Sequence, residues 1–278
     1  MNKLMIACDP HRFINDLDET IVARLITRLE SRAQDKVFTH LLDNYLTRLA
    51  LPRSVQVLEI GCGTGAVLRH MARREDFSGK AVGVDQCQPF ITSAQRFAHD
   101  ENLDEYIEFR LGDVHKLEFS DASFDAVIAH TVLSHVTDPE AVLREMARVV
   151  RPGGRVVIFD GDYASLTYAY HDFDLGREMD RALATATFNN PYLMRNLPRL
   201  LPLLGLALSS AWGDAVTEIG TASYFKSFAE TYAPFVTKAG LLPAATVEVW
   251  LERQRQSMQN GSFFAACNYY TYLATRSD

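Results

Sequence analysis

The stretch VQVLEIGCGTG at residues 55–65 constrains the fold more than any other part of the chain. Its apolar first part has the nearly continuous hydrophobic pattern of a strand that is buried on both faces of a parallel sheet. Three glycines follow, and the amphipathic segment AVLRHMARR begins directly after them. Glycine permits positive φ and lets the backbone approach a ligand closely. The order of strand, glycine loop and helix therefore predicts a site for a nucleotide-like ligand.

The glycine loop alone fits more than one class of cofactor. Gly61, Gly63 and Ala66 satisfy the dinucleotide fingerprint G-x-G-x-x-A, and Asp85 lies about 20 residues further on, where a ribose-binding acid belongs. A nicotinamide-dependent oxidoreductase is therefore one interpretation. It is disfavoured because no Tyr-x-x-x-Lys pair follows the fourth expected strand. It also leaves Gly112-Asp113 and the Pro-Gly-Gly turn at 152–154 unexplained.

The chain alternates strands and helices on both sides of the glycine loop. The pattern predicts strands at 55–60, 80–84, 107–111, 124–129 and 155–160, with helices over 64–74, from Pro89, and from Pro139 to about Val150. Such alternation predicts a parallel, doubly wound sheet whose ligand lies at the carboxyl ends of the strands. We expect an α/β, Rossmann-like sheet that is mostly parallel, with an antiparallel C-terminal strand and a helical cap.

The flanking segments are expected to cover this core. Apolar stripes predict two helices within residues 17–50. After residue 160 the pattern loosens, and it predicts helices at 174–188, 191–204, 222–239 and 244–258, with strands at 206–218 and 263–275. We therefore expect three parts: N-terminal helices that cover the cofactor site (1–52), a cofactor-binding core (53–162), and the remainder of the sheet with helical substrate-cap insertions (163–278).

Composition narrows the classes of partner. The net charge is −7 and no long basic run is present, which argues against nucleic acid. The most apolar stretch, 197–211, is interrupted by prolines, an arginine and a glycine, so no membrane span is expected. The candidate surfaces for a homodimer are residues 1–20 and the helices at 222–258. Reduced thiols, a cytoplasmic location and no metal site are expected, because no C-x-x-C pair occurs among Cys8, Cys62, Cys87 and Cys267.

Each expected strand carries a polar signature at or near one end, and together these signatures resemble a known family. The motifs are LEIGCGTG, VGVD, GDV, FDAVIAHTVLSHV and VVRPGGRVVIFD, and they cover residues 55–160. The segment resembles a class I S-adenosylmethionine-dependent methyltransferase of the small-molecule type, similar to the ubiquinone and menaquinone biosynthesis methyltransferases. The resemblance implies S-adenosyl-L-methionine as cofactor and S-adenosyl-L-homocysteine as product. A noncatalytic binding protein with this fold is the remaining alternative, and the intact glycine loop argues against it.

The resemblance also implies roles for individual residues. Asp85 would accept hydrogen bonds from both ribose hydroxyls, and Gln86 beside it would flank the adenine. Asp113 would accept from the adenine amino group, while Val114 offers a backbone N–H. The cofactor-binding set is completed by residues expected at the loop, at the third strand end and at the methionine end of the cofactor: Gly61, Cys62, Gly63, Gly112, His130 and Arg32.

Methyl transfer from a sulfonium asks the protein mainly to align the acceptor and to exclude water, and a general base is needed only for some acceptors. His135, Tyr163 and Asp162 are the expected catalytic residues, because they lie near the carboxyl ends of the fourth and fifth strands. A structural role for His135 remains the alternative. Aromatic residues in the irregular stretch 161–173, including Tyr168, could line a pocket for a ring-bearing or lipophilic acceptor.

Overall fold

The computed structural model describes residues 18–52 and 54–277. Most of the N-terminal segment that was expected to support a homodimer lies outside this range. The elements in chain order are α1 (Glu19–Gln34), α2 (Lys36–Leu49), β1 (Gln56–Ile60), α3 (Ala66–Ala72), β2 (Lys80–Asp85), α4 (Gln88–Asp100), β3 (Ile107–Leu111), β4 (Phe124–His130), α5 (Pro139–Val149), β5 (Val150–Tyr168), α6 (Phe173–Thr187), η2 (Leu193–Arg195), α7 (Leu197–Leu203), β6 (Leu206–Gly220), α8 (Tyr224–Lys238), α9 (Ala244–Gln259) and β7 (Phe263–Arg276).

The strands form one seven-stranded sheet in the order β3-β2-β1-β4-β5-β7-β6. The pairs β1–β2, β1–β4, β2–β3 and β4–β5 are parallel. Only β7 runs against its neighbours, β5 and β6. The strand order reverses between β1 and β4, where the crevice of a doubly wound sheet opens. The expected Rossmann-like sheet with an antiparallel C-terminal strand is confirmed.

Alternate side chains of the parallel strands enter two hydrophobic cores. Val57 and Phe159 belong to the core that includes residues of α1, α2, α3 and α4. Leu58 and Ile158 belong to the core that includes residues of α5 and α7. Because side chains alternate across a strand, the continuous apolar runs of the sequence serve both cores at once. Among the described helices, none combines the length and the apolar character that a membrane crossing requires.

The main departure from the expected fold is the length of β5. The strand was predicted to end at residue 160, but it continues to Tyr168 and pairs with β7 along this extension. A register shift between Asp162 and Thr167 interrupts the pairing. The stretch was misread as irregular because its backbone partner lies about a hundred residues later in the chain, which no local pattern reveals. The expected part boundary at 162/163 consequently falls inside one strand.

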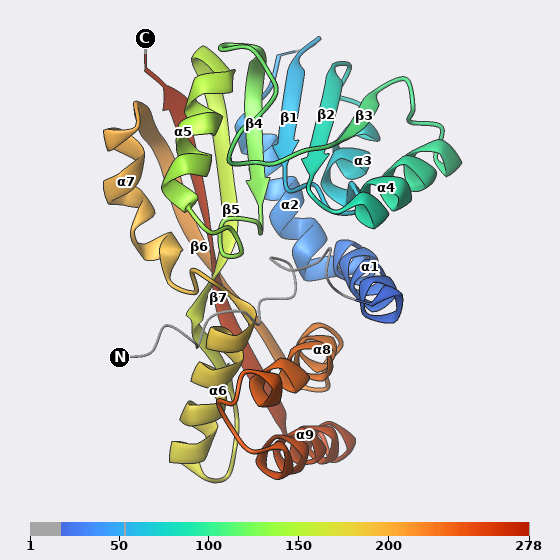
Figure 1. The fold of residues 1–278 in the computed structure, drawn as a ribbon, viewed down its shortest axis with the longest axis vertical. Helices are drawn as coiled ribbons and strands as arrows, with labels where there is room; N and C mark the ends of the chain where they lie inside the picture. The colour runs from blue at the N-terminus through green and yellow to red at the C-terminus, as the bar shows by residue number, and fades with distance from the viewer. Residues whose placement is uncertain (1–17, 53, 278) are drawn as a thin grey trace.

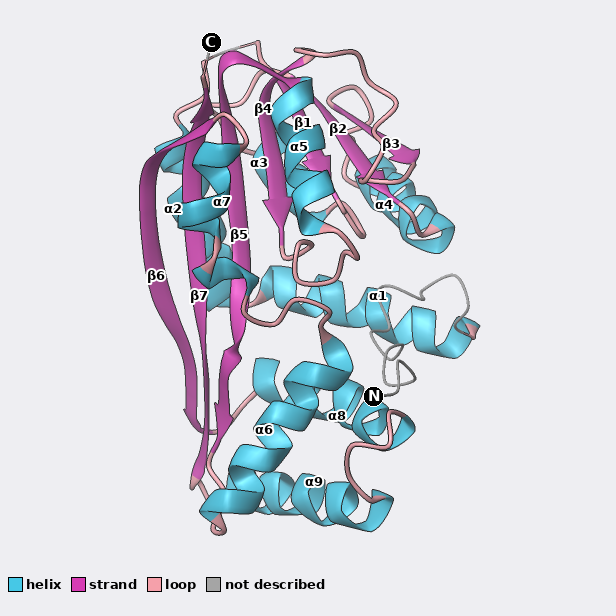
Figure 2. Cartoon of the chain, turned by 60° about the vertical axis from the view of Figure 1, so that its left-hand side comes forward, coloured by secondary structure: helices cyan, strands magenta, loops and turns pink. Residues whose placement is uncertain are grey.

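The long strands give the molecule two levels (Figures 1 and 2). β5, β6 and β7 extend beyond the carboxyl ends of the parallel strands, and α6, α8 and α9 lie along this extension. α1 crosses between the parallel core and these helices. Its position is held from the core side by Arg69 of α3, whose Nη2 lies 2.7 Å from a carboxylate oxygen of Glu30.

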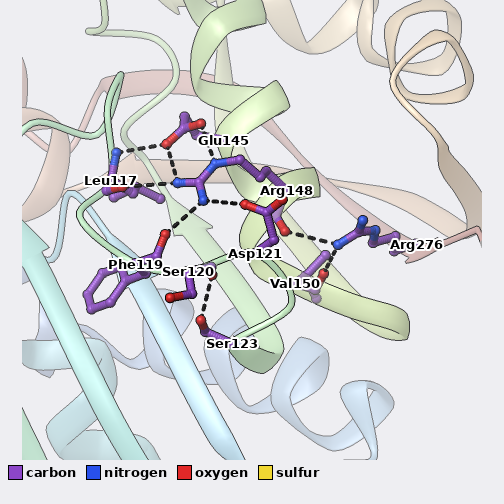
Figure 3. Close-up of polar contacts among 9 residues, drawn as sticks. All are labelled: Leu117, Phe119, Ser120, Asp121, Ser123, Glu145, Arg148, Val150 and Arg276. Atoms are coloured by element: carbon purple, nitrogen blue, oxygen red, sulfur yellow. Dashed lines mark hydrogen bonds and ion pairs between the residues drawn. The ribbon is translucent and has the colours of Figure 1, made fainter.

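A polar cluster lies at the other end of the parallel strands, at the amino ends of β4 and β5 (Figure 3). Arg148 at the end of α5 donates to Glu145 at 2.7 Å, to Asp121 at 2.8 Å and to the backbone carbonyls of Leu117 and Phe119. Arg276 in the last strand donates to the carbonyls of Arg148 and Val150. These bonds tie the β3–β4 connection, α5 and β7 together, away from the carboxyl ends where a ligand is expected.

Candidate functional site

A cavity of about 400 Å³ lies at the carboxyl ends of β1, β2 and β4. Its volume is typical of small-molecule sites, which span roughly 300–1,000 Å³. Two groups of residues line it. The polar part consists of Glu59, Gly61, Cys62, Gly63, Asp85, Gln86, Asp113 and Val114. The aromatic part consists of Arg28, Phe38, Tyr163, Phe188, Tyr224, Phe228 and Tyr232.

The glycine loop forms the floor of the polar part. Gly61 and Gly63 have positive φ values of +61° and +54°. A Cβ at Gly61 would lie only 2.3 Å from Cγ2 of Val132, and one at Gly63 would lie 3.2 Å from Leu29 of α1. Positions 61 and 63 are therefore restricted to glycine by backbone conformation and by close packing. At these two positions the backbone faces the cavity without a side chain.

Asp85, the last residue of β2, connects the second strand to the glycine loop. Its carboxylate accepts from the backbone N–H of Gly63 at 2.8 Å and from that of Cys87 at 2.9 Å. Burial raises the pKa of this carboxyl, and the N–H donors offset part of the effect. Asp85, which is expected to bind the ribose, thus lines the cavity and also orders the glycine loop beside it.

Glu59 of β1 is buried at the base of the polar part. Burial, followed by the nearby Asp85, raises the pKa of Glu59 well above its usual value. Within the described residues, its Oε2 atom is buried and has no hydrogen-bond partner. A buried carboxyl oxygen without a partner is costly, so this atom is suited to a cationic or donor group of a ligand.

Asp113 follows β3 and lies at the open side of the cavity. Its side chain is 64% exposed, and its carboxylate accepts from the Nδ1 of His115 at 2.7 Å. Partial burial acts to raise the pKa of Asp113, but the hydrogen bonds from His115 lower it overall. Val114 and His115 also line the cavity, whereas Gly112 lies just outside the lining.

Residues at the end of β4 join the two parts. Thr131 has a φ of +53°, a strained value for a threonine, and its Oγ1 accepts from Nη2 of Arg32 at 2.8 Å. His130 lies 2.9 Å, at Nδ1, from the hydroxyl of Tyr45. Burial, with a smaller effect of the Arg32 charge, lowers the pKa of His130 well below 6.5, so the ring is neutral at pH 7. Arg32 thus lies beside the end of β4, and the carbon at the centre of its guanidinium lies 5.6 Å from the ring centroid of Phe38.

The aromatic part is a cluster of rings from α2, β5, the C-terminal end of α6 and α8. Tyr163 stacks on Phe188 with 3.4 Å between ring centroids, and Phe188 lies 6.1 Å from Phe228. Phe38 of α2 lies 4.5 Å from Tyr224. Burial raises the pKa of Tyr163 well above 10, so its hydroxyl remains protonated at neutral pH. The cluster offers apolar faces and a hydroxyl donor, but no base from Tyr163.

The structure brings together most of the residues expected at the site. All of the expected cofactor ligands except Gly112 line the cavity, as do His135 and Tyr163. His135 packs its ring 5.0 Å from that of Phe188. Asp162 does not join them: although it directly precedes Tyr163 on β5, its carboxylate pairs with Arg195 at 2.8 Å. Tyr168 is likewise buried away from the cavity, with its hydroxyl donating to the carbonyl of Phe225.

Sequence reasoning missed several lining residues, chiefly Arg28, His115, Thr131, Phe228 and Tyr232. Arg28 could have been found, because it precedes Arg32 by one helical turn and follows the buried Leu25 by three residues. An arginine on the buried stripe of an amphipathic helix is unusual. The aromatic residues of α8 carried no comparable signal, since a stripe of rings is most often core.

Comparisons with known proteins agree with this geometry. A family model described as a methyltransferase domain matches residues 58–158. A phosphatidylethanolamine N-methyltransferase from Cereibacter sphaeroides is 34% identical over 143 residues, which cover 49% of this chain and 68% of that protein. An uncharacterised 37.1 kDa protein in transposon TN4556 of Streptomyces fradiae is 33% identical over 223 residues, which cover 78% of this chain and 61% of that protein.

Other curated relatives, like the Streptomyces fradiae protein, are matched over only part of their length, between 31% and 61%. Among solved structures, geranyl diphosphate C-methyltransferase from Streptomyces coelicolor A3(2), in complex with Mg²⁺, geranyl-S-thiolodiphosphate and S-adenosyl-L-homocysteine, has a TM-score of 0.55. The match covers 86% of this chain and 78% of that chain at 16% identity, which shows the shared fold. The motifs, the sheet order and these matches agree: the chain belongs to the class I S-adenosylmethionine-dependent methyltransferases.

Proposed function

We propose that the chain transfers a methyl group from S-adenosylmethionine to a small aromatic or lipophilic acceptor. The observation that carries this proposal is that one cavity contains both the glycine loop with its strand-end acids and a wall of aromatic rings. The first group suits a nucleoside, and the second suits an apolar acceptor. A shared cavity would let the two reactants meet in line and away from water.

The polar part fits the cofactor group by group. Asp85 would accept hydrogen bonds from the ribose hydroxyls and Asp113 from the adenine amino group, since both line the cavity. The unpartnered Oε2 of Glu59 suits the ammonium at the amino-acid end of the cofactor, and Arg32 suits its carboxylate. S-Adenosylmethionine supplies an electrophilic methyl group on a positively charged sulfur. S-Adenosylhomocysteine is present in the solved Streptomyces coelicolor relative, which supports the same assignment here.

Of the three residues expected to act in catalysis, His135 is the best placed to accept a proton from the acceptor. It lines the cavity beside the aromatic wall, and imidazole is the side chain best suited to this role near neutral pH. Tyr163, protonated at neutral pH, would position the acceptor by donating a hydrogen bond. Asp162 is better explained as the ion-pair partner of Arg195.

Calorimetric titration tests the cofactor assignment. We expect S-adenosylhomocysteine to bind with a stoichiometry of one and NADH not to bind. Asp85→Asn should weaken the binding of S-adenosylhomocysteine by about 30-fold, because a carboxylate acceptor for two hydroxyls is lost. Binding of NADH in place of S-adenosylhomocysteine would support the oxidoreductase alternative.

Turnover separates an enzyme from a noncatalytic binding protein. Methyl-labelled S-adenosylmethionine, supplied with a panel of ring-bearing and lipophilic acceptors, should yield a labelled product. His135→Asn should lower kcat for a hydroxyl or protonated-amine acceptor by about 100-fold or more, while leaving the affinity for S-adenosylhomocysteine unchanged. Cofactor binding without turnover of any acceptor would favour the noncatalytic alternative.

The remaining expectations are also proposals. A small-molecule acceptor rather than nucleic acid is supported by the net charge of −7. A cytoplasmic location is supported by the three described cysteines, which are all unpaired. A homodimer through α8 and α9 is supported by the exposed Val249 on α9. Light scattering at the operating concentration checks the dimer, and a monomeric mass would contradict it. The three expected parts, 1–52, 53–162 and 163–278, stay a functional division of one folded unit.

A further inference from the structure

We propose that the methyl acceptor carries a carboxylate and that the guanidinium of Arg28 binds it in the aromatic part of the cavity. This inference rests on the proposed function and adds the chemical class of the acceptor: an aromatic or lipophilic carboxylic acid, ionised at neutral pH. The observations that carry it are the burial of Arg28, its neighbours and the lack of a counter-charge for it among the described residues.

Arg28 is a buried cation inside an aromatic cage. The residue is 8% exposed and lines the cavity. The carbon at the centre of its guanidinium lies 5.1 Å from the ring centroid of Tyr224, 5.2 Å from that of Phe228 and 5.0 Å from that of Tyr232. Cation–π contacts of this kind hold a cation in place without neutralising it.

The hydrogen bonds of Arg28 leave its charge unbalanced. Nε donates to the hydroxyl of Tyr232 at 3.4 Å, and Nη1 donates to that of Ser227 at 3.3 Å; both bonds are long. Within residues 18–52 and 54–277, no carboxylate forms an ion pair with this guanidinium. Burying an arginine without a carboxylate destabilises a folded protein, so its presence beside a cavity points to an anion supplied by a ligand.

A second buried arginine shows what a structural role looks like in the same molecule. Arg69 is 4% exposed, and its guanidinium reaches Glu30 at 2.7 Å and Glu101 at 2.5 Å. Its charge is therefore balanced within the chain. Arg28, equally buried, has rings and hydroxyls in the corresponding positions. The difference separates an arginine that holds elements together from one that is available to a ligand.

The cofactor carboxylate is the competing anion, and the geometry directs it to Arg32 instead. Arg32 bonds to Thr131 at the end of β4, and Leu29 of the same helix packs over Gly63 of the glycine loop. Among the described residues, Arg28 instead has its hydrogen-bond and cation–π partners on α8. The two arginines are one helical turn apart on α1, so a cavity that holds two carboxylates has one cation for each.

A carboxylate fits this position better than a phosphate does. The planar guanidinium matches a carboxylate in a bidentate arrangement. Arg28 and Arg32 are the only lysine or arginine side chains in the described lining, and Arg32 is bonded to Thr131 at the end of β4. A dianionic phosphate in the aromatic part would therefore keep about half of its charge unmatched. The stacked rings of Tyr163 and Phe188 provide an apolar face for the body of the acid.

Matched small probes test this inference on the intact chain. Benzoate and benzamide have nearly the same shape and differ in charge. With the chain saturated with S-adenosylhomocysteine, we expect benzoate to bind about tenfold or more tightly than benzamide, as measured by ligand-observed NMR or calorimetry. Arg28→Gln should abolish this preference, and Arg28→Lys should retain only part of it because the planar fork is lost.

Arg24→Gln is the matched control. It removes the same charge from an exposed position of α1, one turn before Arg28, and should keep the full benzoate preference. Arg28→Gln should itself bind S-adenosylhomocysteine within about twofold of the parent, which shows that the variant is folded and that Arg32 serves the cofactor. Equal binding of benzoate and benzamide, no binding of either, or a preference that survives Arg28→Gln would each overturn the inference.

These outcomes are distinct from a failure of the proposed function. If the unmodified chain does not bind S-adenosylhomocysteine, the methyltransferase proposal fails before the probes are used. If it binds S-adenosylhomocysteine but shows no charge preference among the probes, only the assignment of the acceptor class fails. If Arg28→Gln weakens the binding of S-adenosylhomocysteine as strongly as Arg32→Gln does, Arg28 binds the cofactor and the inference is wrong.

Discussion

The polar and aromatic parts of the cavity are built in opposite ways. The polar part comes from strand ends and the glycine loop of one parallel sheet, and its members lie close together in the sequence. The aromatic part is assembled from segments far apart in the chain: Arg28 of α1 and Tyr232 of α8 are 204 residues apart. The first part is therefore set by local motifs, whereas the second depends on how the C-terminal helices pack against an N-terminal helix.

The two buried arginines show what this difference means for stability. Arg69, beside the polar part, is paired with two carboxylates, whereas Arg28, in the aromatic part, has none in the described chain. Arg69 lies outside the cavity lining, and its charge is used within the fold. The side that meets the acceptor leaves a charge for the acceptor to balance. The predictions below test this contrast.

The largest effect is expected from exchanging the two buried arginines for methionine. Arg69→Met should lower the free energy of unfolding by about 3 kcal/mol, because Glu30 would lose its cation and Glu101 would keep only Arg73. Arg28→Met should leave it unchanged or raise it, since no carboxylate is abandoned and a buried charge is removed. Urea unfolding of the apo chain measures both values. Equal losses in the two variants would remove the distinction between them.

A smaller effect is expected in the glycine loop. Gly61→Ala should lower the free energy of unfolding by about 2 kcal/mol, because the new Cβ would meet Val132 and the backbone has a positive φ. Gly153→Ala is the control: its φ is +72° but a Cβ there meets nothing within 4 Å, so only about 1 kcal/mol should be lost. Equal losses in the free energy of unfolding for the two variants would show that the glycine loop is not closely packed around Gly61.

The neutral His130 at the junction predicts a pH dependence of stability. Burial keeps its folded-state pKa well below 6.5, so the unfolded chain takes up a proton there at a higher pH than the folded chain does. The free energy of unfolding should therefore fall as the pH drops below about 6.5, by up to about 1.4 kcal/mol per pH unit from this residue.

Urea unfolding between about pH 7.5 and pH 5.5 measures this slope. His130→Asn should make it shallower, whereas His99→Asn, at an exposed position, should leave it unchanged. Parallel slopes for the parent and for His130→Asn would show that His130 is protonated alike in both states.

The smallest effect is expected at Asp113. Because this side chain is 64% exposed, a hydrogen bond from a ligand amino group there competes with water. Asp113→Asn should weaken the binding of S-adenosylhomocysteine about threefold, as measured by calorimetry, which is far less than the effect of Asp85→Asn. Equal losses at the two positions would mean that Asp113 becomes enclosed when the cofactor binds.

The sequence was sufficient for the sheet and for the polar part. Gly61, Asp85 and Asp113 follow or end buried strands, and parallel strands bring their carboxyl ends to one edge. Asp162 was expected at the site for the same reason, but β5 continues past it and its carboxylate pairs with Arg195, a partner 33 residues later that no local pattern indicates. Arg28 was missed because its significance depends on α8, and no local pattern indicates which distant helix an N-terminal helix will contact.

A crystal structure of the chain with S-adenosylhomocysteine tests the division of the cavity most directly. We predict the ribose on Asp85, the amino-acid carboxylate on Arg32, and Arg28 free of the cofactor at the aromatic part. Electron density that instead shows the cofactor carboxylate on Arg28, with the nucleoside away from the glycine loop, would contradict the division into a cofactor side and an acceptor side.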